Sequence, residues 1–199
     1  MKTRIHHLAA AAMLCAAAAG ASAATYTTIL SGNKEVVPNT SQGIGAAAVK
    51  FDAATHVLEI SSAFAGLLGD STAAHIHCCT TAPGMGGAGV ATEVPSFAGF
   101  PLGVQTGAYH HSFDTSLAAS WNPSFLNGYG GSTSAAEAAL LAGLNAGSAY
   151  FNIHSTAYPD GEIRGFLAPT TPVPEPASLA MLGLGLPAVL LAVRRRKPT

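Results

Sequence analysis

Apolar and polar or small residues alternate in the stretch AAAVKFDAATHVLEISSAF, which covers residues 46–64. A period of two is typical of a half-buried β-strand, because successive side chains point to opposite faces of a sheet. The alternation breaks once, at residues 52–55, where Asp-Ala-Ala-Thr favours a turn. The stretch therefore predicts a β-hairpin of two antiparallel strands.

Short apolar runs separated by Gly, Pro, Ser and Asn continue on both sides of this hairpin. We expect further strands at residues 26–30, 72–79, 107–113, 148–154 and 161–167, a long loop at 80–106 and a packed loop at 120–131. One helix is predicted over residues 134–145, with Ser134 as N-cap and Glu137 three residues on. Residues 24–168 are thus predicted to form an all-β domain, an antiparallel β-sandwich or a Greek-key-like barrel with one short helix.

The first 23 residues have the three parts of a secretory signal peptide. Lys2 and Arg4 supply positive charge, an apolar run covers residues 8–19, and Ala21-Ser22-Ala23 is a small-x-small cleavage site. We expect signal peptidase to cut here, so that the exported chain begins near Ala24.

The C-terminal end predicts a membrane segment. Residues 177–193 carry no charge, and the basic tail at 194–199 follows directly, with Arg194, Arg195 and Arg196. A helix over this run would be roughly 25 Å long, near the lower limit for crossing a bilayer, and the cations are expected to stay in the cytoplasm. We therefore predict a transmembrane helix in the inner membrane, joined to the domain by a proline-rich linker at 169–176, as a permanent or a transient anchor.

The charge of the chain is unevenly distributed. Between residues 24 and 168, three Lys and Arg stand against nine Asp and Glu, although the whole chain has a net charge of −1. An acidic domain argues against nucleic acid as a partner, because that binding depends on Lys and Arg meeting phosphates.

Three segments carry a family resemblance: AHIH at 74–77, GSAYFNIHS at 147–155 and PDGEIRG at 159–165. In this order they resemble the CHRD (chordin) domain. The resemblance covers most of residues 26–167 and implies a β-rich extracellular module without a well-defined biochemical activity.

The tail resembles the PEP-CTERM sorting signal. The motif Pro174-Glu175-Pro176, the apolar run and the arginine cluster occur in the order of that signal. The resemblance implies processing by an exosortase and delivery to the cell surface or extracellular matrix of a Gram-negative bacterium.

Histidines at a spacing of two suggest a metal site. His75 and His77 share one face of their predicted strand, with Cα atoms about 6.6 Å apart. If the late strands lie beside it, His154 and Glu162 could join them, and imidazoles with a carboxylate suit copper or zinc. The alternative is a structural polar cluster that also contains Asn152 and Arg164 and fixes the register of the strands.

Cys78 and Cys79 are the only cysteines of the exported part, and they are neighbours. They could form a strained vicinal disulfide, remain thiols or link two chains. Cys79 lies four residues from His75, about 13 Å along a strand, which is too far for one shared ion without a bulge.

Sequence motifs of common enzyme classes are missing. The chain has no G-x-S-x-G, Walker loop, H-E-x-x-H or dinucleotide fingerprint. The H-x-H strand is similar to one in copper–zinc superoxide dismutase, but the further histidines and the zinc loop of that enzyme are not recognisable. We expect a non-enzymatic surface or matrix protein that acts in adhesion, biofilm or envelope architecture, with extracellular polysaccharide or matrix as partner. The alternatives are a metal-binding module and, third, a redox enzyme that uses Cys78 and Cys79.

Overall fold

The computed structural model describes residues 23–170. Its elements are β1 (Ala24–Ser31), η1 (Gly32–Lys34), β2 (Ile44–Asp52), β3 (Val57–Ala65), β4 (Ser71–His77), β5 (Gly107–Asp114), η2 (Ala118–Ser120), α1 (Pro123–Gly128), α2 (Thr133–Ala146), β6 (Tyr150–Ser155), β7 (Ile163–Phe166) and β8 (Ala168–Pro169). The signal peptide, the end of the linker, the transmembrane helix and the basic tail that we predicted lie outside the described residues. Within residues 23–170, no helix has the length and apolar character needed to cross a membrane.

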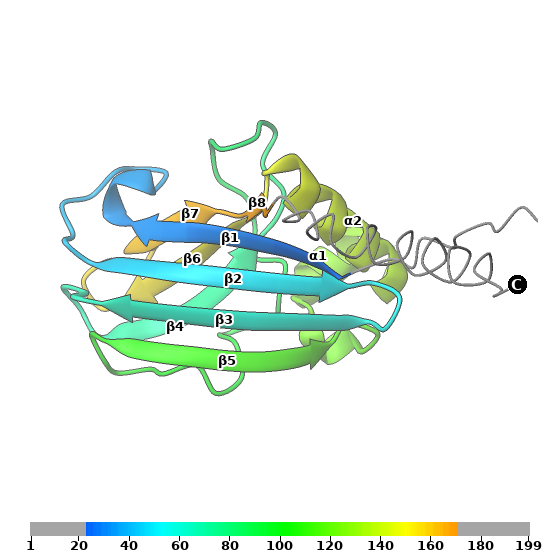
Figure 1. Ribbon diagram of the computed structural model, residues 1–199, viewed down its shortest axis with the longest axis horizontal. Helices are drawn as coiled ribbons and strands as arrows, with labels where there is room; N and C mark the ends of the chain where they lie inside the picture. The colour runs from blue at the N-terminus through cyan, green and yellow to red at the C-terminus, as the bar shows by residue number, and fades with distance from the viewer. Residues whose placement is uncertain (1–22, 171–199) are drawn as a thin grey trace, which may run out of the picture.

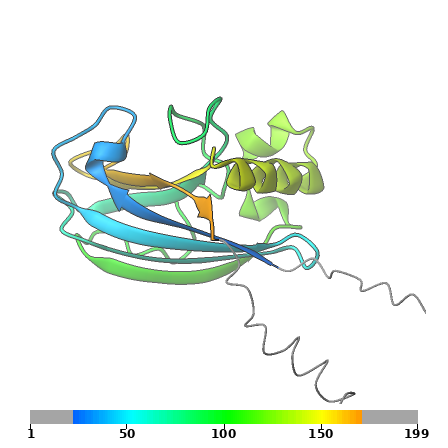
Figure 2. The same ribbon diagram turned by 45° about the horizontal axis from the view of Figure 1, so that its top comes forward.

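The strands form one antiparallel sheet in the order β4-β6-β7-β1-β2-β3-β5, with β8 beside β1. The sheet curls into a half-barrel, so that β4 and β6 lie behind β2 and β3 (Figures 1 and 2). The predicted antiparallel β architecture is confirmed, but the strands form a single curled sheet rather than the two separate sheets of a sandwich.

The hairpin predicted from residues 46–64 is formed by β2 and β3. Val49 lies opposite Ile60, and Phe51 lies opposite Leu58. All four side chains are buried, because they occupy the face of the sheet that turns toward the core. The alternation in the sequence therefore records which face of these strands is buried.

The long segment between β4 and β5 closes the open side of the half-barrel. Its Phe97 is 2% exposed, and its ring centroid lies 5.6 Å from those of Phe113 in β5 and Phe151 in β6. The segment also runs along the edge of β4, where Ala91 and Phe97 donate backbone hydrogen bonds to carbonyls of that strand. One buried aromatic residue thus joins distant strands of the sheet.

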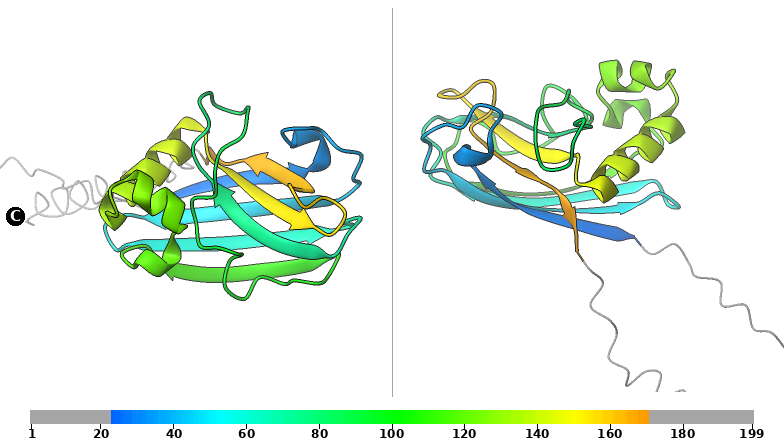
Figure 3. Two further views of the ribbon diagram at one scale, coloured as in Figure 1. Left: turned by 180° about the vertical axis from the view of Figure 1, so that it is seen from behind. Right: turned by 90° about the horizontal axis from the view of Figure 1, so that it is seen from above.

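Two helices, α1 and α2, cover one end of the half-barrel (Figure 3). We predicted a packed loop where α1 forms; its start is the pair Asn122-Pro123, in which Asn122 accepts a hydrogen bond from the N–H of Ser124. The predicted N-cap of α2 is also wrong. Ser132, not Ser134, caps the helix and accepts from the N–H of Ala135.

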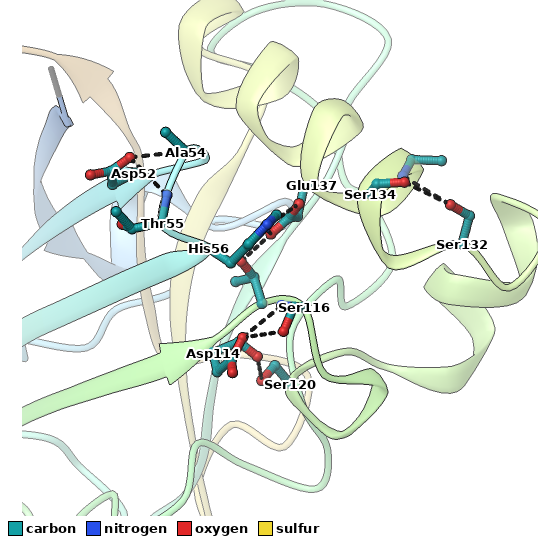
Figure 4. A network of polar contacts seen from close by, with 12 residues as sticks. Asp52, Ala54, Thr55, His56, Asp114, Ser116, Ser120, Ser132, Ser134 and Glu137 are labelled. Atoms are coloured by element: carbon teal, nitrogen blue, oxygen red, sulfur yellow. Dashed lines mark hydrogen bonds and ion pairs between the residues drawn. The ribbon is translucent and has the colours of Figure 1, made fainter. Parts of the chain in front are cut away.

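Glu137 does not take part in capping, because its carboxylate is used elsewhere. It is 5% exposed and accepts a hydrogen bond from the hydroxyl of Thr115, and His56 Nδ1 lies 2.9 Å from its Oε1 (Figure 4). His56 belongs to the turn between β2 and β3. This contact attaches α2 to the hairpin.

Replacing Phe97 with alanine tests how much its aromatic contacts stabilise the fold. We expect Phe97→Ala to lower the free energy of unfolding by about 3–5 kcal/mol, because the cavity would lie between two halves of the sheet. Urea unfolding of the exported protein measures this change. Leu102→Ala, at a residue of the same segment that is 50% exposed, is the control and should change stability by less than about 0.5 kcal/mol. Equal losses of unfolding free energy in both variants would contradict the role of Phe97 in joining the distant strands.

A second pair of variants tests the start of α2. Ser132→Ala should cost about 1 kcal/mol of stability, because the N–H of Ala135 loses its acceptor. Ser134→Ala should cost clearly less in the same unfolding measurement, since Ser134 is exposed and lies two residues after the N-cap, inside the helix. The reverse order would show that the helix begins where the sequence alone suggested.

Candidate metal centre

The candidate site lies on the outer face of β4, β6 and β7, opposite the core. His75 pairs with Asn152 across β4 and β6, and Asn152 pairs with Arg164 across β6 and β7. Their neighbours in the sequence, such as Ile76 and Ile153, are fully buried in the core. Because side chains alternate, burying these apolar residues turns the polar residues outward.

Three histidines meet on this face. The ring centroid of His75 lies 5.8 Å from that of His77 and 5.3 Å from that of His154, and the latter two are 5.9 Å apart. One ring nitrogen from each residue lies within 4.8 Å of the others. The register between β4 and β6 is irregular between Ser71 and Ala73, the residue that pairs with His154. The structure therefore brings His75, His77 and His154 together on this face.

Each histidine is held through its other nitrogen by a backbone carbonyl. His75 Nε2 lies 2.6 Å from the oxygen of Pro95, and His77 Nδ1 lies 2.9 Å from that of Ala88. His154 Nδ1 lies 2.8 Å from the oxygen of Pro159. A carbonyl only accepts, so these nitrogens carry the protons and donate. The lone pairs are therefore on His75 Nδ1, His77 Nε2 and His154 Nε2.

Those three nitrogens are buried, and among residues 23–170 they have no hydrogen-bond partner. Burial lowers the pKa of His75 to about 4 and that of His77 to about 4, although the bond to a carbonyl opposes the change in each case. Burial also lowers the pKa of His154. The rings are therefore neutral at pH 7, which is the form that ligates a metal.

The donor set fits a copper or zinc ion. Zinc sites commonly combine three protein ligands with one open position, and imidazole suits both metals. With bonds of about 2.0–2.1 Å, the nitrogens of one tetrahedral site lie about 3.3–3.4 Å apart, so nitrogens that lie up to 4.8 Å apart would have to move closer to share an ion. The carbonyl partners are also of the kind that orients ligating histidines in metal sites.

Glu162 does not join the histidines. It is fully buried, and its carboxylate accepts from the N–H of Leu68 at 2.5 Å and from the hydroxyl of Ser41 at 2.5 Å. It precedes the first residue of β7, Ile163, so the alternation of a strand does not determine its direction. The predicted ligand instead fixes the connection between β3 and β4.

Arg164 pairs with an acid that is distant in the sequence. Its Nε lies 3.7 Å from Glu35 Oε2, not beside Glu162, and its guanidinium lies 4.7 Å from the centre of the Tyr150 ring. Arg164 also donates to the carbonyls of Lys34 and Gly86. Glu35 could not be predicted as the partner, because a single acid after a turn carries no signal of a contact that is distant in the sequence.

Cys78 and Cys79 form a disulfide just after the end of β4. Both sulfurs pack against Gly143 of α2, where a Cβ atom would collide with them. We predicted that the strand continues to Cys79, but it ends at His77, so the cysteines do not follow the face of the histidines. Among the described residues, the group that could hold an ion comprises the histidines alone.

The lowered pKa values predict a loss of stability in mild acid. Between pH 6.5 and about 4 the unfolded chain binds protons at residues 75 and 77 that the folded chain does not. As the pH falls through this window, the free energy of unfolding should decrease by up to about 1.4 kcal/mol per pH unit for each histidine. Urea unfolding at several pH values with a chelator present measures the slope.

The control for this slope is the double variant His75→Gln/His77→Gln. Its free energy of unfolding should depend less on pH than that of the unmodified protein. Burial raises the pKa of Glu35 to about 7, which stabilises the fold as the pH falls from 7 toward 4.5. That opposing effect occurs in the unmodified protein and in the double variant. The difference between their two pH slopes therefore measures the contribution of the histidines alone. Equal slopes would contradict the neutral, buried state of the rings.

The comparisons with known proteins identify two parts of the chain. The family model for the CHRD domain matches residues 26–167, and that for the PEP-CTERM protein-sorting motif matches residues 172–197. No curated protein and no solved structure shows significant similarity to the chain. The sorting motif directs export and membrane anchoring, followed by delivery to the cell surface in Gram-negative bacteria. CHRD is not a known enzyme family. From its match over residues 26–167, the chain belongs to the CHRD domain family.

Proposed function

We propose that this exported surface protein binds one copper or zinc ion through His75, His77 and His154. One observation supports this above all: the three rings meet, with one nitrogen of each within 4.8 Å of the others, and each ring has a buried nitrogen to which no described residue bonds. The opposite nitrogen of each ring is occupied by a carbonyl, which fixes the tautomer that a metal needs.

The alternative is a purely structural cluster of histidines, and the cost of burial argues against it. A buried polar atom without a partner costs about 1–3 kcal/mol, and this cluster contains three of them. Apolar residues would fill the same space without that cost. One ion would satisfy all three nitrogens at once, and the excess of acids in residues 24–168 would attract a cation.

Metal analysis of the exported protein, purified without a histidine tag, tests the proposal. We expect one copper or zinc ion per chain after loading and dialysis. Replacing any of the three histidines with alanine should weaken binding by more than about 100-fold, beyond the effect typical of losing a supporting residue.

The matched control is His110→Ala/His111→Ala. Both residues are exposed on β5, so this variant should keep its metal. Loading well below one ion per chain, or equal loading of the control and the His75 variant, would refute the site.

The second candidate is a non-enzymatic role in adhesion, biofilm or envelope architecture, and the sorting motif supports it. An exosortase substrate delivered to the surface can act there by its presence in the matrix. A strain that lacks the gene should lose attachment or aggregation. If a copy that lacks the three histidines restores attachment, the role is independent of metal; if only the normal copy restores it, metal binding is part of the role. An unchanged deletion strain would count against this candidate.

A further inference from the structure

A second feature lies beside the histidine cluster. A pocket of about 970 Å³ is enclosed by residues 35–40 after η1, by residues 87–89 and by residues 157–161 between β6 and β7. Its floor is the outer face of β6, with Asn152, and His77 is the one member of the cluster that lines it. The volume is in the range of ligand pockets in proteins.

Two buried acceptors converge at this floor. Glu35 and Asn152 are 8% and 3% exposed, and neither Glu35 Oε1 nor Asn152 Oδ1 has a hydrogen-bond partner in the described part of the chain. Asn152 Oδ1 and Glu35 Oε1 lie 2.9 Å and 3.0 Å from the point where a Cβ of Gly161 would be, so they are at most about 6 Å apart, and Asn152 Nδ2 lies 2.6 Å from the same point. Oxygens of this kind require a donor, and Glu35 and Asn152 are both lining residues of the pocket.

The charge of the floor favours a neutral donor over a cation. The guanidinium of Arg164 lies 3.7 Å from the carboxylate of Glu35 and offsets its charge. Burial also raises the pKa of Glu35 to about 7, so this carboxyl is only partly ionised at pH 7. An amine would lose its hydration here and gain only a weak counter-charge.

The walls of the pocket combine apolar and polar groups, as the surface of a sugar ring does. Val36, Val37 and Pro38 form an apolar side, and Tyr158 lies in the lining with Asn152. A pyranose presents hydroxyl groups at its rim and C–H groups on its faces, so it could meet the acceptors and the apolar side together. We propose that this pocket binds a neutral saccharide, with hydroxyl groups donating to Glu35 and Asn152.

The proposal does not depend on the metal ion, because the two acceptors are outside the histidine cluster. The test therefore uses the exported protein with a chelator present. Maltotriose, cellotriose and N,N′,N″-triacetylchitotriose are titrated separately, and the backbone N–H of Gly161 and the side-chain amide of Asn152 are followed by nitrogen-15 NMR. At least one saccharide should shift these signals in a saturable way.

Two variants and a control define the pocket as the binding site. Asn152→Ala should weaken binding about tenfold, the effect of about 1.4 kcal/mol. Val37→Trp tests the same pocket at its mouth, where residue 37 is 80% exposed and the fold is not at risk. Glu59→Gln, on β3, should bind as the unmodified protein does.

The outcomes are distinct. No shift with any of the three saccharides, shifts that persist unchanged in Val37→Trp, or binding of putrescine in place of saccharide would overturn the proposal. A protein that binds saccharide but holds no metal would refute the metal site alone, and a protein that holds metal but binds no saccharide would refute the pocket alone.

Discussion

The alternation of side chains along β4 is the constraint on which the site depends. Ala74 and Ile76 are fully buried in the core, so His75 and His77 must point to the other face of the strand. A slip of one residue would place two imidazoles in the core and two apolar side chains outside, at a large cost in burial. The energy of the apolar core thus fixes the direction of the histidines, and pairing with β6 brings His154 beside them.

The segments that cover the outer face of β4 determine the protonation state of the histidines. They supply the carbonyls of Ala88, Pro95 and Pro159, one to each histidine, and they remove the rings from water. Desolvation keeps the imidazoles neutral, and each carbonyl decides which nitrogen carries the proton. Long segments without regular structure therefore do as much for the site as the strands, because they set the protonation of its residues.

Sequence reasoning predicted the parts of this structure that depend on local periodicity. The β2–β3 hairpin and the shared face of His75 and His77 follow from a period of two. That period does not tell which strands pair, so the approach of His154 remained conditional until the pairing of β4 with β6 was seen. Contacts set by tertiary structure were missed. Glu162 lies just outside a strand and binds the β3–β4 connection, while Glu137 bonds to the β2–β3 turn rather than capping α2. Neither partner is close in the sequence, so no local pattern could indicate it, and the same holds for the pairing of Arg164 with Glu35.

The protonation pattern of the histidine rings tests the account most directly. In metal-free protein at pH 7, long-range proton–nitrogen NMR assigns the tautomer of each imidazole. The account predicts three neutral rings with mixed tautomers: the proton on Nε2 of His75, and on Nδ1 of His77 and His154. Charged imidazolium rings, or one common tautomer for all three residues, would contradict it, because the unpaired nitrogens would then not be Nδ1 of His75 and Nε2 of His77 and His154.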